Sequence, residues 1–400
     1  MEMHMPSDQL PYGMRNVLLL ALSQAALMTS ISLVLASSVV IGANLATPAL
    51  ATLPLAMQYL GTMLVLYPAA RLINRYGHKI VFCGGSLIGA LGLALAALGI
   101  WFESFPLFAL SGILVGVFNA VGQYYRFAAA EAVSINLRSK AISLTLSGGV
   151  IAALAGPKLA QWTRDMLPQP FTASFLALVC VALIAALLAK GLHLKQAVQL
   201  PDNLNTPFLP LLRRPDFVLA VVSGVVGYAL MNLLMSATPL AMMCSNFDFA
   251  DTATVIQWHV VAMFAPSFIT GSLILRFGVM PVMLFGGISM LASIGIAING
   301  ETLINFELAL VLLGIGWNFL YIGATARLVE CCPPQQKAQV QAFNDTLVFF
   351  AVASITFSTG ELMNRYGWET INLYSIIPVT LLMIAIAWQW LVGIRKPFPA

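Results

Sequence analysis

Two pairs of soft metal-ligating side chains stand at helical spacing in the second half of the sequence. Met231 and Met235 are four residues apart, and His259 and Met263 have the same separation. A separation of four places both members of a pair on one face of a helix. Thioether sulfur and imidazole nitrogen favour Cu(I), whereas Mg²⁺ and Ca²⁺ demand oxygen ligands. The four residues are therefore a candidate copper site if their helices lie side by side.

Further residues are candidates for assisting such a site. Met242, Met243 and Cys244 follow the first pair and are candidates for metal entry or thiol redox chemistry. Charged groups near or inside apolar segments are candidates for coupling or gating, although a charge at the membrane edge needs no transport role. The candidates of this kind are Asp345, Arg126 and Glu131.

The composition excludes a water-soluble enzyme. Of the 400 residues, 60% are hydrophobic and only 8% are charged, whereas a soluble chain carries about 25% charged residues. Five cysteines without a spaced quartet argue against a disulfide scaffold or a zinc finger. The sequence has no Walker loop and no hydrolytic triad, so we expect no enzymatic activity, no ATP-driven pumping and no cofactor.

Apolar runs long enough to cross a bilayer recur along the whole chain. A span needs about 20 predominantly apolar residues, and twelve such runs predict an all-α polytopic membrane protein with twelve transmembrane helices. The expected spans are 17–42, 47–70, 80–101, 105–127, 141–162, 171–192, 217–240, 252–275, 279–299, 306–329, 341–363 and 371–393.

The basic residues predict the orientation of these spans. With a cytoplasmic N-terminus, all of the 19 Lys and Arg residues except Lys158, Arg164 and Arg365 fall on the cytoplasmic side, which is the bias that positive-inside topology requires. Both termini are then cytoplasmic. The proline-rich stretch 193–216 predicts a cytoplasmic linker between two six-helix bundles, 1–192 and 217–400.

Packing is the ordinary alternative for the soft residues. With 18 methionines in 400 positions, about one Met-x-x-x-Met pair is expected by chance, and methionine fills apolar gaps without any ligand role. His259 differs, because it is the one histidine of four that falls within an expected span. An ionisable group at that depth is a functional candidate.

The loop after the second span carries a family resemblance. Its sequence, Arg71-Leu-Ile-Asn-Arg-Tyr-Gly-His-Lys79, resembles the signature loop of the major facilitator superfamily, and Leu275-Arg-Phe-Gly278 repeats part of it after the eighth span. The resemblance implies two six-helix bundles that work by alternating access, with a gating latch in the loop. The latch residues would be Asn74, Arg75, Gly77 and Lys79, although Asn74 stands where the family has an ion-pairing aspartate.

A second resemblance concerns the segment Gln257 to Gly271. Together with the two four-residue pairs, it is similar to the eighth helix of the CcoA-type copper importers. This resemblance implies copper import, with Cu(I) as the expected form, across the bacterial cytoplasmic (inner) membrane to supply a cbb₃-type haem-copper oxidase. The implied partners are the copper ion, the lipid bilayer and a cytoplasmic copper chaperone or exporting pump, with no nucleic acid.

Two other functions stay open at this point. A carrier of an organic solute, a drug or a metal-siderophore would use the methionines only to line an apolar cavity, with aromatic walls such as Trp317, Tyr321 and Tyr124. A membrane copper sensor or assembly factor would bind the metal without transporting it. The residues alone do not establish the direction of transport.

Overall fold

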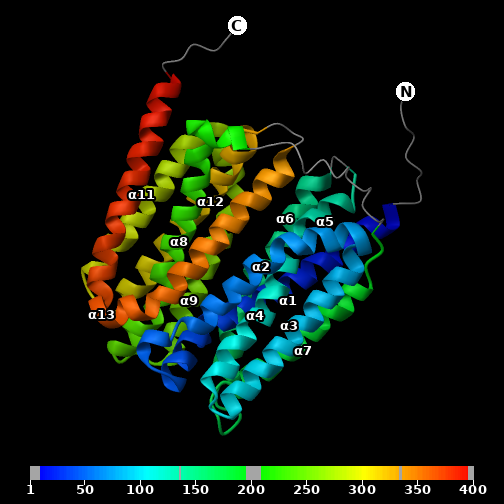
Figure 1. Cartoon of the computed structure of the whole chain (residues 1–400), viewed down its shortest axis with the longest axis vertical. Helices are drawn as coiled ribbons and strands as arrows, with labels where there is room; N and C mark the ends of the chain where they lie inside the picture. Colours follow the sequence, from blue (N-terminus) through cyan, green and yellow to red (C-terminus); the bar gives the residue numbers. More distant parts are fainter. Residues whose placement is uncertain (1–9, 135–136, 195–208, 333–335, 395–400) are drawn as a thin grey trace. The chain divides into compact units, whose positions relative to one another are not determined.

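The computed structural model describes residues 10–134, 137–194, 209–332 and 336–394 (Figure 1). Within these ranges the regular structure is entirely helical, as the apolar runs predict. The helices are α1 (Leu10–Leu45), α2 (Leu53–Tyr76), α3 (His78–Trp101), α4 (Phe105–Gly122), α5 (Tyr125–Glu131), α6 (Arg138–Thr163), α7 (Thr172–Lys190), α8 (Pro215–Cys244), α9 (Phe249–Phe264), α10 (Ser267–Phe277), α11 (Val279–Ile298), α12 (Leu303–Glu330) and α13 (Lys337–Ile394), with short 3₁₀ helices η2 (Pro48–Leu50) and η4 (Leu209–Arg213).

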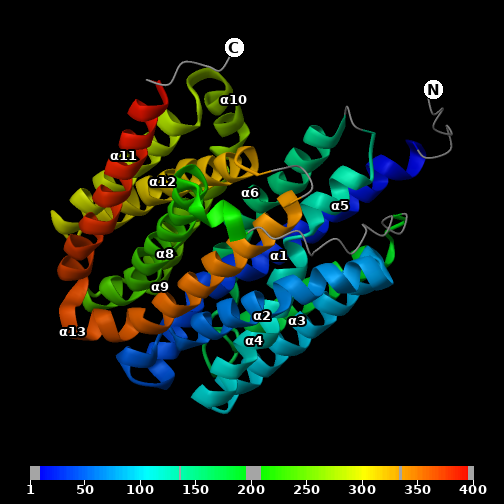
Figure 2. The ribbon, with the colours of Figure 1, turned by 45° about the horizontal axis from the view of Figure 1, so that its top comes forward.

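The helices agree with twelve membrane crossings. Among the described residues, ten helices are long and apolar enough to span a bilayer, and α9 with α10 form an eleventh span bent by 41°. The last candidate, 339–392, has 54 residues, which at 1.5 Å per residue reach about 80 Å, whereas one crossing needs about 30 Å. Its backbone leaves the helical conformation at Gly367, and Figures 1 and 2 show α13 turning back there.

Glycine makes the tight turn predicted for the signature loop. Gly77 joins α2 to α3 with φ 83°, and Gly278 joins α10 to α11 with φ 89°. Gly367 divides α13 with φ 76°. A side chain at such positive φ is strained, so glycine is the residue that reverses these paired helices without a longer loop. The loop repeat seen in the sequence is thus a repeat in backbone geometry.

The chain forms two compact units. The first comprises Met1–Val34 and Gly61–Pro201, and the second comprises Leu35–Leu60 and Asp202–Ala400, as far as these ranges are described. The end of α1 and the start of α2 therefore pack with the second unit, although they precede the expected linker. Residues 195–208 of that linker lie outside the described residues.

Small residues allow close helix packing in the first unit. α3 packs against α4 and α7. A Cβ atom at Gly89 would lie 2.5 Å from Cβ of Phe118, and one at Gly99 would lie 2.7 Å from the backbone nitrogen of Phe108. Between membrane helices, where lipid competes with apolar contacts, such close backbone approach is a main source of association.

In the second unit α12 packs against α8, α9 and α11, and α13 packs against α8 and α11. Gly314 of α12 lies directly on α9, since a Cβ there would lie 2.7 Å from the carbonyl oxygen of His259 and 3.0 Å from the nitrogen of Met263. The face of α9 that carries the predicted His-Met pair is therefore held tightly against α12.

Candidate functional site

The four predicted copper ligands all lie in the second unit, in the interior. Met231 and Met235 belong to α8, and His259 and Met263 belong to α9. Both helices pack on α12. The His259 ring is directed at α12, because its Nδ1 lies 2.7 Å from the carbonyl oxygen of Leu310. All four side chains are buried, and their binding of a single ion remains a prediction.

The hydrogen bond of His259 defines its tautomer. A carbonyl oxygen only accepts, so Nδ1 carries the proton that is donated to Leu310. Nε2 then carries a lone pair, and among the described residues it has no hydrogen-bond partner. The side chain combines a packing contact with one unused acceptor atom.

The proposed entry residues differ in exposure at the end of α8. Met242 is buried and Met243 is half-buried, while Cys244 is exposed and its thiol is free. The neighbouring Ser245 donates a hydrogen bond of 2.8 Å to Glu301. Of the three residues, Cys244 is therefore the most exposed, and an entry role remains a prediction.

The segment that carries the second resemblance is a break in the helix. The expected span 252–275 divides at Ala265 and Pro266 into α9 and α10. Asn318 of α12 stabilises the break, because its Nδ2 donates to the carbonyl of Met263 and to the hydroxyl of Ser267, both at 2.7 Å. Its Oδ1 accepts from Thr270 at 2.7 Å. Backbone groups freed by a proline in a membrane helix need such partners.

Next to this break, five aromatic residues form what we call the Tyr228 cluster: Tyr228, Phe264, Trp317, Tyr321 and Phe349. Trp317 and Tyr321, one turn apart on α12, stack with ring centroids 5.2 Å apart and planes at 12°. Tyr228 of α8 meets both rings edge-on, each at 5.2 Å. Phe264 lies 6.2 Å from Trp317, and Phe349 lies 6.1 Å from Tyr228.

The cluster has unused surface and an unused donor. Tyr228, Phe264 and Tyr321 are half-buried, so part of each ring remains accessible. Trp317 is only 6% exposed, and among the described residues its Nε1 has no hydrogen-bond acceptor. A buried indole N–H without an acceptor loses its hydration, and such a group is uncommon away from functional sites.

A polar network adjoins the aromatic rings. Asn232 lies one turn after Tyr228 on α8, and its Nδ2 donates to the hydroxyl oxygen of Tyr59 at 2.9 Å. Its Oδ1 accepts from Thr356 of α13 at 2.5 Å. The Tyr59 ring lies 6.4 Å from the ring of Phe349. The network and the Tyr228 cluster are therefore continuous within the second unit.

Comparison with known proteins identifies the family. Residues 18–343 match the Major Facilitator Superfamily.

This chain belongs to the major facilitator superfamily.

Its relatives are transporters by name. The chain is 38% identical over 375 residues to "Riboflavin transporter RfnT" of Brucella anthropi, covering 92% of this chain and 94% of that protein. It is 27% identical over 378 residues to "Uncharacterized MFS-type transporter YdeG" of Bacillus subtilis, covering 89% and 88% of the two chains. The protein is thus a non-enzymatic, multi-pass transporter of the bacterial inner membrane, as expected.

The more specific resemblance is not supported. The family match and the riboflavin transporter agree with the superfamily assignment but give no support to a CcoA-type copper importer. The Pro266 segment that suggested that resemblance has a structural explanation, since it breaks a span and Asn318 satisfies the freed backbone.

The signature loop of this facilitator contacts α5 through His78. Asn74, Arg75 and Lys79 are exposed. The buried His78 places Nε2 3.6 Å from a carboxylate oxygen of Glu131. Glu131 thus meets the loop, as a gating role requires, and that role remains a prediction.

The other coupling candidates lie in different units. Arg126, in the first unit, has its guanidinium carbon 4.8 Å from the Phe127 ring centroid. Asp345, in the second unit, is half-buried and accepts a hydrogen bond of 3.3 Å from Asn344. Sequence reasoning named Asp345 as a coupling candidate at the start of a span, and that role remains a prediction.

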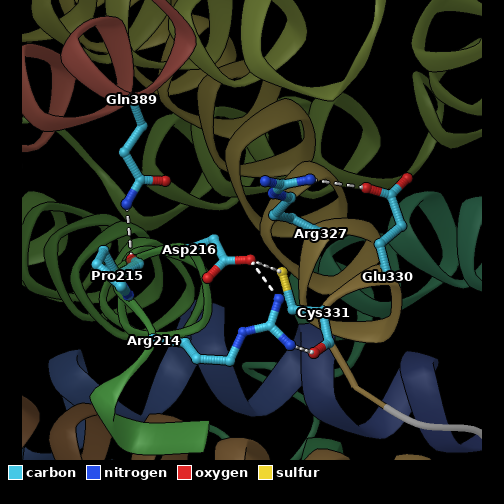
Figure 3. A network of polar contacts seen from close by, with 7 residues as sticks. All are labelled: Arg214, Pro215, Asp216, Arg327, Glu330, Cys331 and Gln389. Atoms are coloured by element: carbon cyan, nitrogen blue, oxygen red, sulfur yellow. Dashed lines mark hydrogen bonds and ion pairs between the residues drawn. The ribbon is translucent and has the colours of Figure 1, made fainter. Parts of the chain in front are cut away.

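Sequence reasoning missed a polar network at the start of α8 (Figure 3). Arg214 forms an ion pair of 3.0 Å with Asp216 and donates to the Cys331 carbonyl at 3.2 Å. The Cys331 thiol lies 3.4 Å from Asp216. Burial raises the pKa of this thiol to about 11, which opposes the thiolate form that binds metals. Cys331 joins the end of α12 to the start of α8.

Proposed function

We propose that this protein carries an organic solute with a planar ring system, of which riboflavin is the leading case. The observation that carries the proposal is the relationship to the riboflavin transporter, which extends over nearly the whole length of both chains. Transport would follow alternating access, in which the substrate site opens to one side of the membrane, closes around the substrate and then opens to the other side.

The Tyr228 cluster suits such a substrate. A flat ring gains most from aromatic partners that offer a face or an edge at centroid separations of about 4.5–7 Å. Trp317 and Tyr321 already have this relation to each other, and Tyr228 meets both rings edge-on. Stacking of a ring on a protein aromatic contributes about 1–3 kcal/mol. Trp317 and Tyr321 were named from the sequence as walls for this type of carrier, whereas Tyr124 lies in the first unit.

Copper uptake has no support from the relatives. Burial of Met231, Met235 and Met263 agrees with their use as gap-filling apolar residues. Supply of a cbb₃-type oxidase, a copper chaperone partner and the sensor alternative all depend on copper binding, to which the relatives give no support. The Nε2 atom of His259 has no hydrogen-bond partner among the described residues, and this lone pair is the reason to measure copper uptake as well.

The test is uptake of radiolabelled riboflavin by proteoliposomes that contain the purified protein, with copper accumulation measured in parallel. We expect riboflavin uptake by the wild type and a rise in KM of about tenfold in Trp317→Ala. Trp388→Ala is the matched control, because Trp388 is 70% exposed on α13 of the same unit. Copper accumulation without riboflavin uptake would refute the proposal.

A further inference from the structure

We infer that the turn between α1 and α2 is the external gate of this transporter, and that Gly360 of α13 is the residue that lets the gate close. The turn comprises residues 46–52 and includes the 3₁₀ helix η2. The bias of the basic residues places it on the outside of the membrane. The inference goes beyond the proposed function, because it concerns how external access is closed and holds for any substrate.

The turn packs with the second unit, although it precedes the linker in the sequence. Residues 35–60 belong to that unit, whereas α1 before residue 35 and α2 after residue 60 belong to the first. η2 packs against α13, and Figures 1 and 2 show the blue turn beside the orange part of α13. A segment of the first expected bundle therefore contacts a helix of the second. Alternating access requires contacts of this kind to break and form again in each cycle.

Gly360 allows the turn to approach α13 closely. A Cβ atom at this position would lie 2.5 Å from the carbonyl oxygen of Ala49 and 2.8 Å from that of Pro48. Real Cβ atoms essentially never lie within 3.0 Å of such atoms, so a side chain here would push the turn away. The backbone nitrogen of Gly360 also donates a hydrogen bond of 3.0 Å to the hydroxyl of Thr52. Both residues are buried, so the contact excludes solvent at this point.

A second contact lies deeper along the same two helices. Tyr59 follows Thr52 by seven residues, which is two turns of α2, and Thr356 precedes Gly360 by one turn of α13. Tyr59 and Thr356 each lie within hydrogen-bond distance of the Asn232 side chain of α8, at 2.9 and 2.5 Å. All three side chains are buried. The start of α2 is therefore held at two depths, which makes a continuous seal.

The composition of the turn suits a contact that opens and closes. Residues 46–60 contain no charged side chain, so no ion pair has to be broken when the turn leaves α13. The hydrogen bonds that hold it are individually weak between membrane helices. Permanent packing is the alternative. A permanent contact would protect Thr52 from external reagents in every folded variant, whereas a gate exposes Thr52 whenever the closed state is destabilised.

The experiment measures external access to residue 52 in intact bacterial cells that express the protein. Thr52→Cys introduces a thiol of similar size, and a membrane-impermeant methanethiosulfonate labels it from outside at a rate that mass spectrometry measures. Adding Gly360→Leu should raise this rate at least about tenfold, because overpacking disfavours the closed state. Gly295→Leu is the matched control, since a Cβ at Gly295 of α11 meets open space, and it should leave the rate within about twofold.

A second variant covers the case in which Gly360→Leu folds poorly, which size-exclusion profiles reveal. Gly360→Ala adds only the Cβ atom and should raise the labelling rate by a smaller factor. In folded Gly360→Leu, kcat for riboflavin uptake should fall at least about tenfold without a rise in KM, because closure becomes rare while the external side stays open.

Labelling of residue 52 that stays within about twofold of the Thr52→Cys parent in folded variants would overturn the inference, and so would an equal rise in Gly295→Leu. Failure of the wild type to take up riboflavin would overturn the proposed function alone, because the labelling rates test the gate without any substrate.

Discussion

The side chain of Asn318 is expected to stabilise the second unit by holding the break between α9 and α10. Replacement by alanine removes three hydrogen bonds of 2.7 Å, to Met263, Ser267 and Thr270. The Thr270 hydroxyl keeps the Pro266 carbonyl as an acceptor at 2.8 Å, and Ser267 is a hydroxyl that can rotate. The Met263 carbonyl, however, loses its side-chain partner at a proline break.

The expected loss of stability is estimated from the hydrogen bonds that are lost and the carbonyl that is left without its side-chain partner. Hydrogen bonds between membrane helices contribute about 0.6 kcal/mol each on average, and a buried group left unsatisfied costs about 1–3 kcal/mol. Asn318→Ala should therefore destabilise the protein by about 2–4 kcal/mol. For a unit of this size, each kcal/mol corresponds to roughly 2–4 °C, so the melting temperature should fall by roughly 4–16 °C.

Buried thiols provide the assay. Cys331 and Cys332 are buried, while Cys180 and Cys244 are exposed, so a thiol-reactive dye gains signal on unfolding above a constant background. Asn299→Ala is the matched control, because Asn299 is exposed at the end of α11, and it should change stability by less than about 0.5 kcal/mol. A melting temperature for Asn318→Ala within about 2 °C of the wild type would refute the reasoning.

Three further predictions use other contacts. Gly314→Ala should lower the free energy of unfolding by about 1–3 kcal/mol, because the new Cβ meets the backbone of α9. Gly271→Ala, with open space around the new Cβ, should be neutral or stabilising. Equal melting temperatures of the two variants would contradict this prediction. Asp345→Asn should abolish proton-driven accumulation but keep riboflavin exchange, because an amide takes up no proton; retained accumulation would exclude this coupling role. Maleimide at pH 8 should label the exposed Cys244 at least about 100-fold faster than the buried Cys331. Burial raises the pKa of the Cys331 thiol from 9.0 to about 11, so this thiol becomes the reactive thiolate only as the pH rises toward that value. Comparable labelling rates, measured by mass spectrometry, would count against a buried thiol.

Composition and local pattern were sufficient for the architecture. Apolar runs predicted every span because lipid imposes helical hydrogen bonding on each crossing separately. The turn at Gly77 was also predictable, since positive φ is a local property of glycine. Even the interruption of the eighth span had a local signal in Pro266, although the sequence reading continued the helix to 275.

The site depended on packing that no local pattern reveals. Spacing placed Met231 with Met235 and His259 with Met263, but it did not show that His259 bonds to α12. Asn232 and Tyr59 are separated by 173 residues, and neither stood out from the other polar residues in apolar runs.

What the sequence alone determined about this protein is therefore its membrane location, its helices and its reversals, because each depends on the chemistry of neighbouring residues and of the bilayer. The tertiary structure decided which side chains meet: Tyr228 and Asn232 belong to α8, Trp317 and Tyr321 belong to α12, and Tyr59 belongs to α2. Hydrogen bonds and ring contacts act over a few ångströms in space, so their partners are chosen by the packing of helices and not by distance along the chain.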